Sequence, residues 1–231
     1  MPTRKEASAL TGAEQKSYVN TVKQMLGDPA NPYGKLVAIH GNMSHNQHGM
    51  NAVGTQRFLS WHRAYLLHFE KALQTIDTLA FIPYWDWTKH KAVPKWMKTF
   101  KPTVFIPGRG SVIVKRNASI PAKKNVTAIM SLPDYTSFTD QLENGPHGEV
   151  HMELGTVNGH VEAMGNIRIS PADPIFWLHH AQLDRLWSLW EANPAHAGLG
   201  PSLSGTNTVM DPWSETATQL HSIQQLGYSY L

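Results

Sequence analysis

Six of the thirteen histidines fall into two groups of three, and this arrangement limits what the chain can fold into. Each group lies in sequence whose apolar residues recur at the three- and four-residue spacing of a helix. The fold must therefore bring helices from two distant parts of the chain together around imidazole rings. In chain order the groups are His40, His48 and His62, and then His147, His151 and His180.

The spacing of the second group has a direct geometric meaning. His147 and His151 are four residues apart, so on a helix they share one face. One such pair is a weak signal, and Gly148 stands where the zinc-protease motif requires glutamate. His180 is followed four residues later by Asp184, which is placed to support it or to hold an arginine. Several imidazoles buried together without a metal would leave nitrogens unpaired, so the pattern predicts a metal centre.

Composition indicates which metal this centre holds. The chain has no cysteine, which excludes thiolate metal sites, disulfides and iron–sulfur clusters. Imidazole is a good ligand for copper, and Cu(II) heads the affinity order at nitrogen sites. Two sets of three imidazoles therefore predict two copper ions that react with dioxygen.

Length and hydropathy predict one globular domain over residues 1–231. No run approaches eighteen apolar residues, so no contact with a membrane is expected. The first residues lack the apolar segment of a secretory signal, which predicts a cytoplasmic protein if the chain is complete. Nothing in the sequence sets the oligomeric state.

The expected architecture is mainly α, a four-helix bundle with long loops and a few short strands, because two helix pairs each present three histidines. Residues 88–133 hold five prolines and predict a long excursion with a short hairpin near 111–115. The tail from Asn193 is rich in Gly, Pro and Ser, with a strand expected at 227–230. Helices are expected over residues 11–27, 35–40, 56–79, 134–143, 148–154 and 174–191.

At this point the sequence resembles a known superfamily. The segments WHRAYLLHFE, PYWDW and DPIFWLHHAQLDRLW look like the copper-A and copper-B signatures of tyrosinases, catechol oxidases and haemocyanins. The likeness covers residues 36–190 and implies a binuclear type 3 copper centre in a four-helix bundle. It divides the chain into a copper-A region (36–87), a basic excursion (88–133), a copper-B region (134–191) and a tail (192–231).

The resemblance also assigns metal ligands. His62 matches the third copper-A ligand, His147 and His151 match the first two copper-B ligands, and His180 matches the third. The neighbouring His179 is interpreted as structural.

The first two copper-A ligands depart from the family pattern. Many members have a ligand nine residues before the WHR histidine, where this chain has Val53. His40 and His48 are the preferred candidates, because the polar loop at 51–56 can absorb the extra spacing, and His45 is the reserve. The remaining histidines match no motif position and are expected to be solvent-facing or structural: His68, His90, His160, His196 and His221.

Three further residues bear on the reaction that the resemblance implies. Glu143, four residues before His147, matches an acidic residue that orders a water in plant-type members and would help to accept a phenol proton. The alternative is that Glu143 only caps or solvates a helix end. Gly148 stands where many efficient hydroxylases have Asn, and Met152 where a basic residue can assist. Both departures favour diphenol oxidation over monophenol hydroxylation.

The predicted function is copper-dependent oxidation of small phenols by dioxygen. It comprises conversion of o-diphenols to o-quinones together with o-hydroxylation of monophenols, as in a tyrosinase. The alternatives are a catechol oxidase without hydroxylase activity and a haemocyanin-like oxygen carrier, for which the tail from Asn193 would have to shield the centre.

The basic excursion allows one other class of partner to be weighed. Residues 88–133 contain no Asp or Glu but half of the twenty Lys and Arg. The segment has few aromatic residues and no recognition motif, so no nucleic acid is expected to bind. It is interpreted as a solvated basic lobe, which would favour anionic phenols if it overhangs the metal site.

Overall fold

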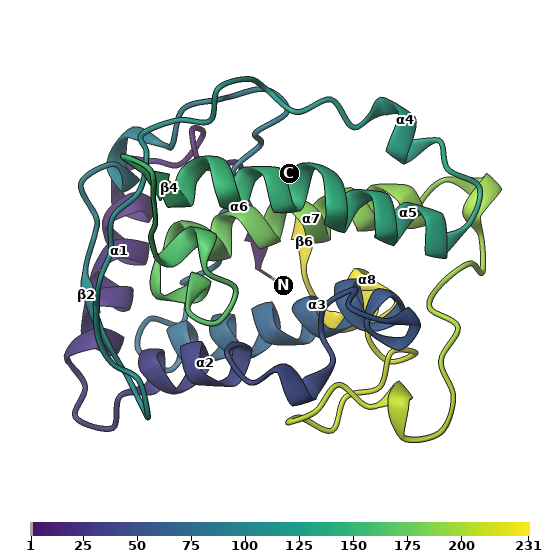
Figure 1. Ribbon diagram of the computed structural model, residues 1–231, viewed down its shortest axis with the longest axis horizontal. Coiled ribbons are helices and arrows are strands. Elements are labelled where there is room, and N and C mark those ends of the chain that lie inside the picture. The colour runs from purple at the N-terminus through teal and green to yellow at the C-terminus, as the bar shows by residue number, and fades with distance from the viewer. Residues whose placement is uncertain (1) are drawn as a thin grey trace.

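The computed structural model describes residues 2–231 and is mainly helical, as the sequence predicts. Figure 1 shows two helix pairs facing each other, with the remaining chain wrapped around them as long loops and short hairpins. The four helices of this bundle are α2 (Pro32–His40), α3 (Ala52–Gln74), α6 (Gly148–Gly155) and α7 (Ile175–Glu191).

Asparagine caps set where the first pair begins. Asn31 accepts a hydrogen bond from the Gly34 amide, so α2 begins at Pro32 and not at Lys35. Asn51 accepts from the Gly54 amide and starts α3 four residues before the predicted position. The predicted end of α3 at residue 79 is also wrong, since the helix ends at Gln74 and a short turn follows. Helix α1 (Gly12–Gly27) has the predicted Thr11 cap, completed by a capping box.

The second pair begins with an irregular junction. Helix α5 (Tyr135–Leu142) passes into α6 through a π-helical turn at Glu143–His147, in which Gly145 has non-helical backbone angles. Figure 1 shows α5 and α6 as one nearly continuous rod. Such turns often occur at functional sites, and this one presents Glu143 and His147 to the bundle interior, where both are buried.

The strands form three two-stranded sheets within residues 2–231. The predicted hairpin of the excursion is β2 (Thr103–Ile106) with β3 (Gly110–Ile113), paired in antiparallel register. A second hairpin, β4 (Thr156–Val157) with β5 (His160–Val161), turns through Asn158 and Gly159, which both have positive φ. The shorter helices are α4 (Thr127–Met130), α8 (Ile223–Leu226) and the single 3-10 turns Met43–His45, Lys95–Met97, Ala163–Gly165, Ser170–Ala172, Pro194–His196 and Gly205–Thr208.

The two ends of the chain meet beside the bundle. Strand β1 (Thr3–Arg4) pairs in parallel with β6 (Ser229–Tyr230), near the predicted C-terminal strand. This pairing buries Arg4 completely, where its guanidinium contacts Glu70 of α3 at 3.0 Å and Asp184 of α7 at 3.2 Å. The termini are therefore attached to both helices that carry the WHR and LHH motifs.

A buried network around Asp184 connects α3 to α7. Its carboxylate accepts hydrogen bonds from Arg63 Nε at 2.5 Å and from the hydroxyls of Tyr228 and Tyr230 at 2.7 and 2.6 Å. Arg63 directly follows His62 in the sequence, and Asp184 lies one helical turn after His180. The network therefore fixes how the two histidine-bearing helices lie against each other.

Aromatic side chains fill the remaining interior. Trp177 of α7 stacks on Phe69 of α3 with ring centroids 3.7 Å apart, and the indole N–H donates to Tyr33 Oη. Within the part of the chain that the structure describes, no helix is both long and apolar enough to cross a bilayer.

Replacing Asp184 by asparagine tests the network. Asp184→Asn removes the charge that compensates buried Arg63 and Arg4, so we expect a loss of about 3–5 kcal/mol in the free energy of unfolding, measured by urea denaturation at pH 7. The exposed ion pair Lys115–Glu162 is the control. Lys115→Ala should lower the free energy of unfolding by less than about 1 kcal/mol.

The same experiment has a pH dependence. Burial alone would raise the pKa of Asp184, but Arg63 and Arg4 hold that pKa below 3.8. A carboxylate with a lowered pKa contributes stability above its unfolded pKa and loses it as the pH falls through the folded one. The difference between wild type and Asp184→Asn should therefore shrink below pH 3.8. A difference that stays constant down to pH 2.5 would contradict the assignment.

Candidate metal centre

The first group of predicted ligands meets in the structure. His40 is the last residue of α2, His48 lies in the following loop and His62 lies on α3. All three are buried, the Nε2 atoms of His40 and His62 are 3.4 Å apart, and the His48 ring lies 5.1 and 5.2 Å from the other two. The three side chains offer nitrogens close enough together to bind one ion.

The second group meets in the same way from α6 and α7. His147 and His151 are 4.6 Å apart between ring centroids, as their i,i+4 spacing requires. The Nε2 atoms of His151 and His180 are 3.2 Å apart. His179 lies in the same cluster, so four histidines offer nitrogens within 4.8 Å of one another.

The two clusters face each other across the bundle. The rings of His62 and His180 stack with centroids 4.4 Å apart. Phe58 contacts His62 and His147, both at 4.8 Å, while Phe176 stacks on His180 at 4.0 Å. The six predicted imidazoles therefore converge in an interior with apolar walls, which is the arrangement of a dicopper site.

Backbone carbonyls set the tautomer of three of these rings. The Nδ1 atoms of His62, His147 and His151 lie 2.8, 3.0 and 2.7 Å from the carbonyl oxygens of Phe58, Glu143 and Met164. A carbonyl only accepts, so each Nδ1 carries the proton and each Nε2 keeps its lone pair. These lone pairs point where a metal would be bound.

Two observations show that the residues fit a copper pair. The Nε2 atoms of His48 and His147 are buried, and no hydrogen-bond partner is found for them among residues 2–231. Burial, reinforced by the neighbouring imidazoles, lowers the pKa of His40, His62, His147 and His180 well below 6.5. Burial also lowers the pKa of His151, to about 4. These five rings are neutral at pH 7, the form that binds metal.

The extra histidine of the second cluster differs from its neighbours. Trp87 Nε1 donates to His179 Nδ1 at 3.0 Å, and an indole N–H can only donate. The proton of His179 is therefore on Nε2, so neither nitrogen keeps a lone pair free for a metal. Its ring stacks parallel to His147 at 5.5 Å. This geometry supports the structural role expected from the sequence.

The reserve candidate, His45, lies outside the first cluster. Its ring stacks on Trp61 at 6.1 Å and its Nδ1 lies 2.5 Å from Asp211 of the tail. Arg57 contacts the same carboxylate, so this histidine attaches the tail to α3. Of the histidines outside the motifs, His196 is buried against Trp190 and serves packing.

Glu143 has a contact that the sequence did not predict. Its Oε1 accepts from the Gly49 amide at 2.9 Å and lies 3.4 Å from Nδ1 of His48. The carboxylate thus comes from the α5–α6 junction and holds the loop of the other histidine group. No local pattern signals a contact between residues 94 positions apart. Its other oxygen, Oε2, is buried and has no hydrogen-bond partner among the described residues.

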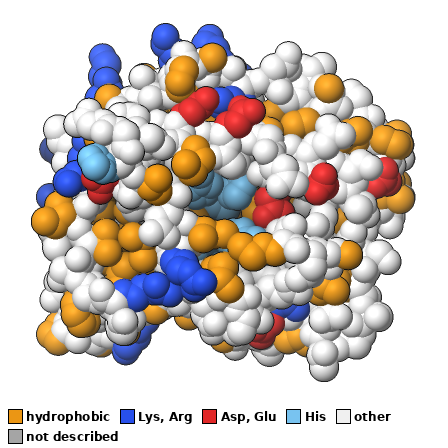
Figure 2. Space-filling model, in the orientation of Figure 1, with side chains coloured by type: hydrophobic (Ala, Val, Ile, Leu, Met, Phe, Trp, Pro, Cys, Tyr) orange, Lys and Arg blue, Asp and Glu red, His pale blue; other side chains and the backbone are white. Residues whose placement is uncertain are grey.

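The histidines line a cavity that opens to solvent. Its volume is about 170 Å³, and Figure 2 shows histidine side chains at the bottom of a hollow in the centre of this face. Neither the basic excursion nor the tail contributes a lining residue. The excursion is therefore not part of the cavity wall, although Arg109 of its hairpin donates to the Gly41 carbonyl beside His40. The walls comprise His40, His48, His147 and His151 together with Gly148, Met152, Met164, Gly165, Ile167 and Ser170.

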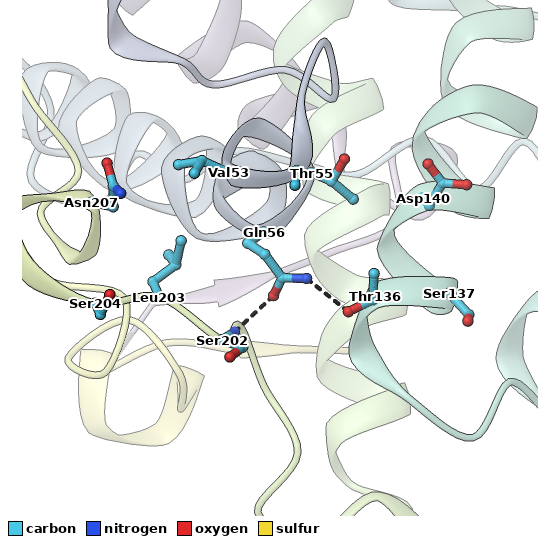
Figure 3. Close-up of a pocket in the computed structure, with 11 residues that line it drawn as sticks. Val53, Thr55, Gln56, Thr136, Ser137, Asp140, Ser202, Leu203, Ser204 and Asn207 are labelled. Carbon is cyan, nitrogen blue, oxygen red and sulfur yellow. Dashed lines mark hydrogen bonds between the residues drawn. The ribbon is translucent and has the colours of Figure 1, made fainter.

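A wider hollow lies between α3, α5 and the tail (Figure 3). Gln56 spans it, donating to Thr136 Oγ1 and accepting from the Ser202 amide, both at 2.7 Å. Its lining includes no histidine, and Asp140 is its one charged group. The hollow marks where the tail attaches and has no constellation for chemistry.

Comparisons with known proteins agree with this geometry. A tyrosinase from Streptomyces lincolnensis is 27% identical over 263 residues, covering 94% of both chains. A functional unit of octopus haemocyanin superposes with a TM-score of 0.79 at 24% identity, covering all of this chain and 68% of that one. A tyrosinase from Burkholderia thailandensis gives 0.76 at 18% identity, covering all of this chain and 73% of that one. The two structures show a shared fold.

The family match covers most of the chain. The profile described as the common central domain of tyrosinase matches residues 30–119 and 106–193, which include both histidine clusters and the helices that carry them. The chain therefore belongs to the tyrosinase family of type 3 copper proteins.

Proposed function

We propose that this protein is a copper-dependent phenol oxidase that converts o-diphenols to o-quinones and hydroxylates monophenols more slowly. The observation that supports it is the convergence of six buried imidazoles at the base of a cavity open to solvent. In the overall diphenol reaction two catechols lose two electrons and two protons each, and one dioxygen is reduced to two waters.

The two clusters divide the metal-binding role. His40, His48 and His62 would hold one copper ion, and His147, His151 and His180 the other. Bound copper supplies dioxygen binding and accepts the electrons of the phenol. The protein supplies the geometry, a surrounding of aromatic rings and, in five of the six imidazoles, rings that are neutral at pH 7.

Glu143 and Gly148 would control proton removal. The Oε2 atom of Glu143, which is buried and has no hydrogen-bond partner among the described residues, would bind the water that accepts the phenol proton, while Oε1 stays bound to Gly49. A side chain at Gly148 would have room, because an added Cβ meets only the Glu143 carbonyl, at 3.4 Å. The chain thus has the proton acceptor but lacks an amide that would orient its water.

Access to the cavity favours an enzyme over an oxygen carrier. A carrier must keep phenols away from the metals, and here the tail beyond Asn193 contributes nothing to the cavity walls. Met152 at the cavity is 47% exposed, so a small phenol reaches the histidines directly.

Copper content and activity test the proposal together. The loaded protein should hold two coppers per chain by metal analysis and oxidise catechol. His62→Ala and His180→Ala should each lose a copper and all activity, since two imidazoles do not hold the ion in place. His90→Ala, which alters an exposed histidine outside the clusters, is the control. A His62→Ala variant with full oxidase activity would refute the assignment.

A second pair of variants tests the copper-A loop. His48→Ala should remove one copper and the activity, because this ring belongs to the first cluster. His45→Ala should keep both coppers and lose only the contacts to Trp61 and Asp211. Metal analysis of the purified variants measures the difference, and the reverse outcome would show that the ligand of this loop is His45.

The balance of the two reactions is the third test. We expect diphenol turnover to exceed monophenol turnover at least tenfold, about 1.4 kcal/mol in barrier, with a lag on monophenols. Gly148→Asn should narrow this ratio, and Glu143→Gln should slow monophenols more than catechols, as measured by initial rates on tyramine and dopamine. If Gly148→Asn leaves the ratio unchanged and Glu143→Gln slows both substrates equally, proton removal is not the step these residues control.

A further inference from the structure

No Asp, Glu, Lys or Arg side chain lines the cavity above the histidines. Apart from the imidazoles, it is lined by glycine, by Met152, Met164 and Ile167, and by the uncharged hydroxyl of Ser170. The nearby carboxylate of Glu143 is directed to Gly49 and His48 and is itself buried. Apart from the metal ions themselves, a ring bound in this cavity therefore meets carbon, sulfur, imidazole nitrogen and one hydroxyl.

Two apolar side chains at this cavity remain open to solvent. Met152 of α6 is 47% exposed and Ile167, from the loop after β5, is 37% exposed. Figure 2 shows apolar side chains at the edge of the hollow that holds the histidines, with an acidic side chain at its right edge and Lys or Arg side chains below it. A ligand that covers exposed apolar area removes it from water, and this stabilises the complex. Methionine is flexible and can adapt to ligands of different shape.

The cations that contact this region do not line the cavity. Lys124 is paired with the carboxylates of Glu149 and Glu153 on α6, at 2.9 and 2.7 Å. Arg109 of the β2–β3 hairpin donates to the Gly41 carbonyl. Arg168 follows Ile167 but is exposed to solvent and is not part of the wall. A carboxylate on the substrate would thus lose hydration at the cavity without gaining a partner within it.

We propose that this site selects phenols whose ring substituent is uncharged and apolar, and that Met152 and Ile167 determine this specificity. The inference rests on the proposed phenol oxidase function and names its substrate class. An alkyl chain leaving the ring covers Met152 and Ile167, whereas a carboxylate in the same place faces an apolar rim.

Three catechols of matched length test the preference on the copper-loaded protein: 4-propylcatechol, dihydrocaffeate and the methyl ester of dihydrocaffeate. We expect kcat/KM for the propyl compound to exceed that for the carboxylate at least tenfold, with the ester near the propyl compound. Each methylene added between methyl and propyl should raise kcat/KM about twofold, because the rim is only half covered. Equal values for the propyl compound and the carboxylate, or a preference for the carboxylate, would overturn the proposal.

Substitutions at the rim locate the preference. Met152→Lys should lower the propyl-to-carboxylate ratio of kcat/KM threefold to fivefold, because it adds a cation at the edge of the cavity. Met152→Gln and Ile167→Thr should reduce the gain per methylene without favouring the carboxylate. Leu189→Lys is the matched control, since Leu189 is also 47% exposed but lies outside the cavity wall. A Leu189→Lys variant that changes the ratio as much as Met152→Lys would overturn the assignment to the rim.

A binding measurement separates this proposal from the proposed function. Aryl methyl ethers cannot be oxidised as phenols, so 4-propylanisole and its propanoate counterpart report on the cavity alone by calorimetry. If the copper-loaded protein oxidises no catechol, the proposed function fails, and this binding still decides the specificity. The proposal is supported if 4-propylanisole binds more tightly than the propanoate and if Met152→Gln weakens the binding of 4-propylanisole. If the wild type instead prefers the propanoate and Arg168→Gln abolishes that preference, the proposal is wrong and the site binds anions through Arg168.

Discussion

The ion pair between Arg63 and Asp184 fixes the geometry on which the metal centre depends. It joins α3 to α7 beside His62 and one turn beyond His180, at a place where neither charge reaches solvent. Burying two charges is costly, and apolar residues of similar volume often pack as well. A directional pair, however, permits only one rotation of each helix. Here that rotation stacks His62 on His180.

The same interior gives the histidines the neutral form that binds metal. Removing several imidazoles from water lowers their pKa values and leaves neutral rings, while carbonyl acceptors hold the proton on Nδ1 in three of them. Burying these polar nitrogens costs free energy of folding, and a bound metal offsets that cost. The neighbouring His179 is held by Trp87 in the opposite tautomer, so two adjacent histidines have different roles.

Local patterns in the sequence were sufficient for the main helices and for four of the six histidines predicted as ligands. Periodicity located α3, α6 and α7, and the motifs placed His62 and His180, because both signals are contained in a few turns. The ends of α3 were misplaced because the apolar spacing says little about the Asn51 cap or about the turn after Gln74. Contacts between distant segments leave no local signal.

Two such contacts shape the centre. The carboxylate of Glu143 meets Gly49 and His48 only after the bundle has formed, and His45 finds Asp211 only once the tail has returned to α3. From the sequence alone His45 was the reserve candidate, because it lies in the same polar segment as His48 and spacing does not distinguish the two. Only the packing of the tail separates them.

The pairing of β1 with β6 has a consequence for how the protein is made. The Asp184 carboxylate contacts Arg4 of β1, and it accepts hydrogen bonds from Tyr228 and from Tyr230 of β6. During synthesis the helices with His62 and His180 leave the ribosome well before Tyr230 does. Their final alignment must wait until β6 has been synthesised and has paired with β1, so the aligned site depends on two strands that are distant from the histidines in sequence.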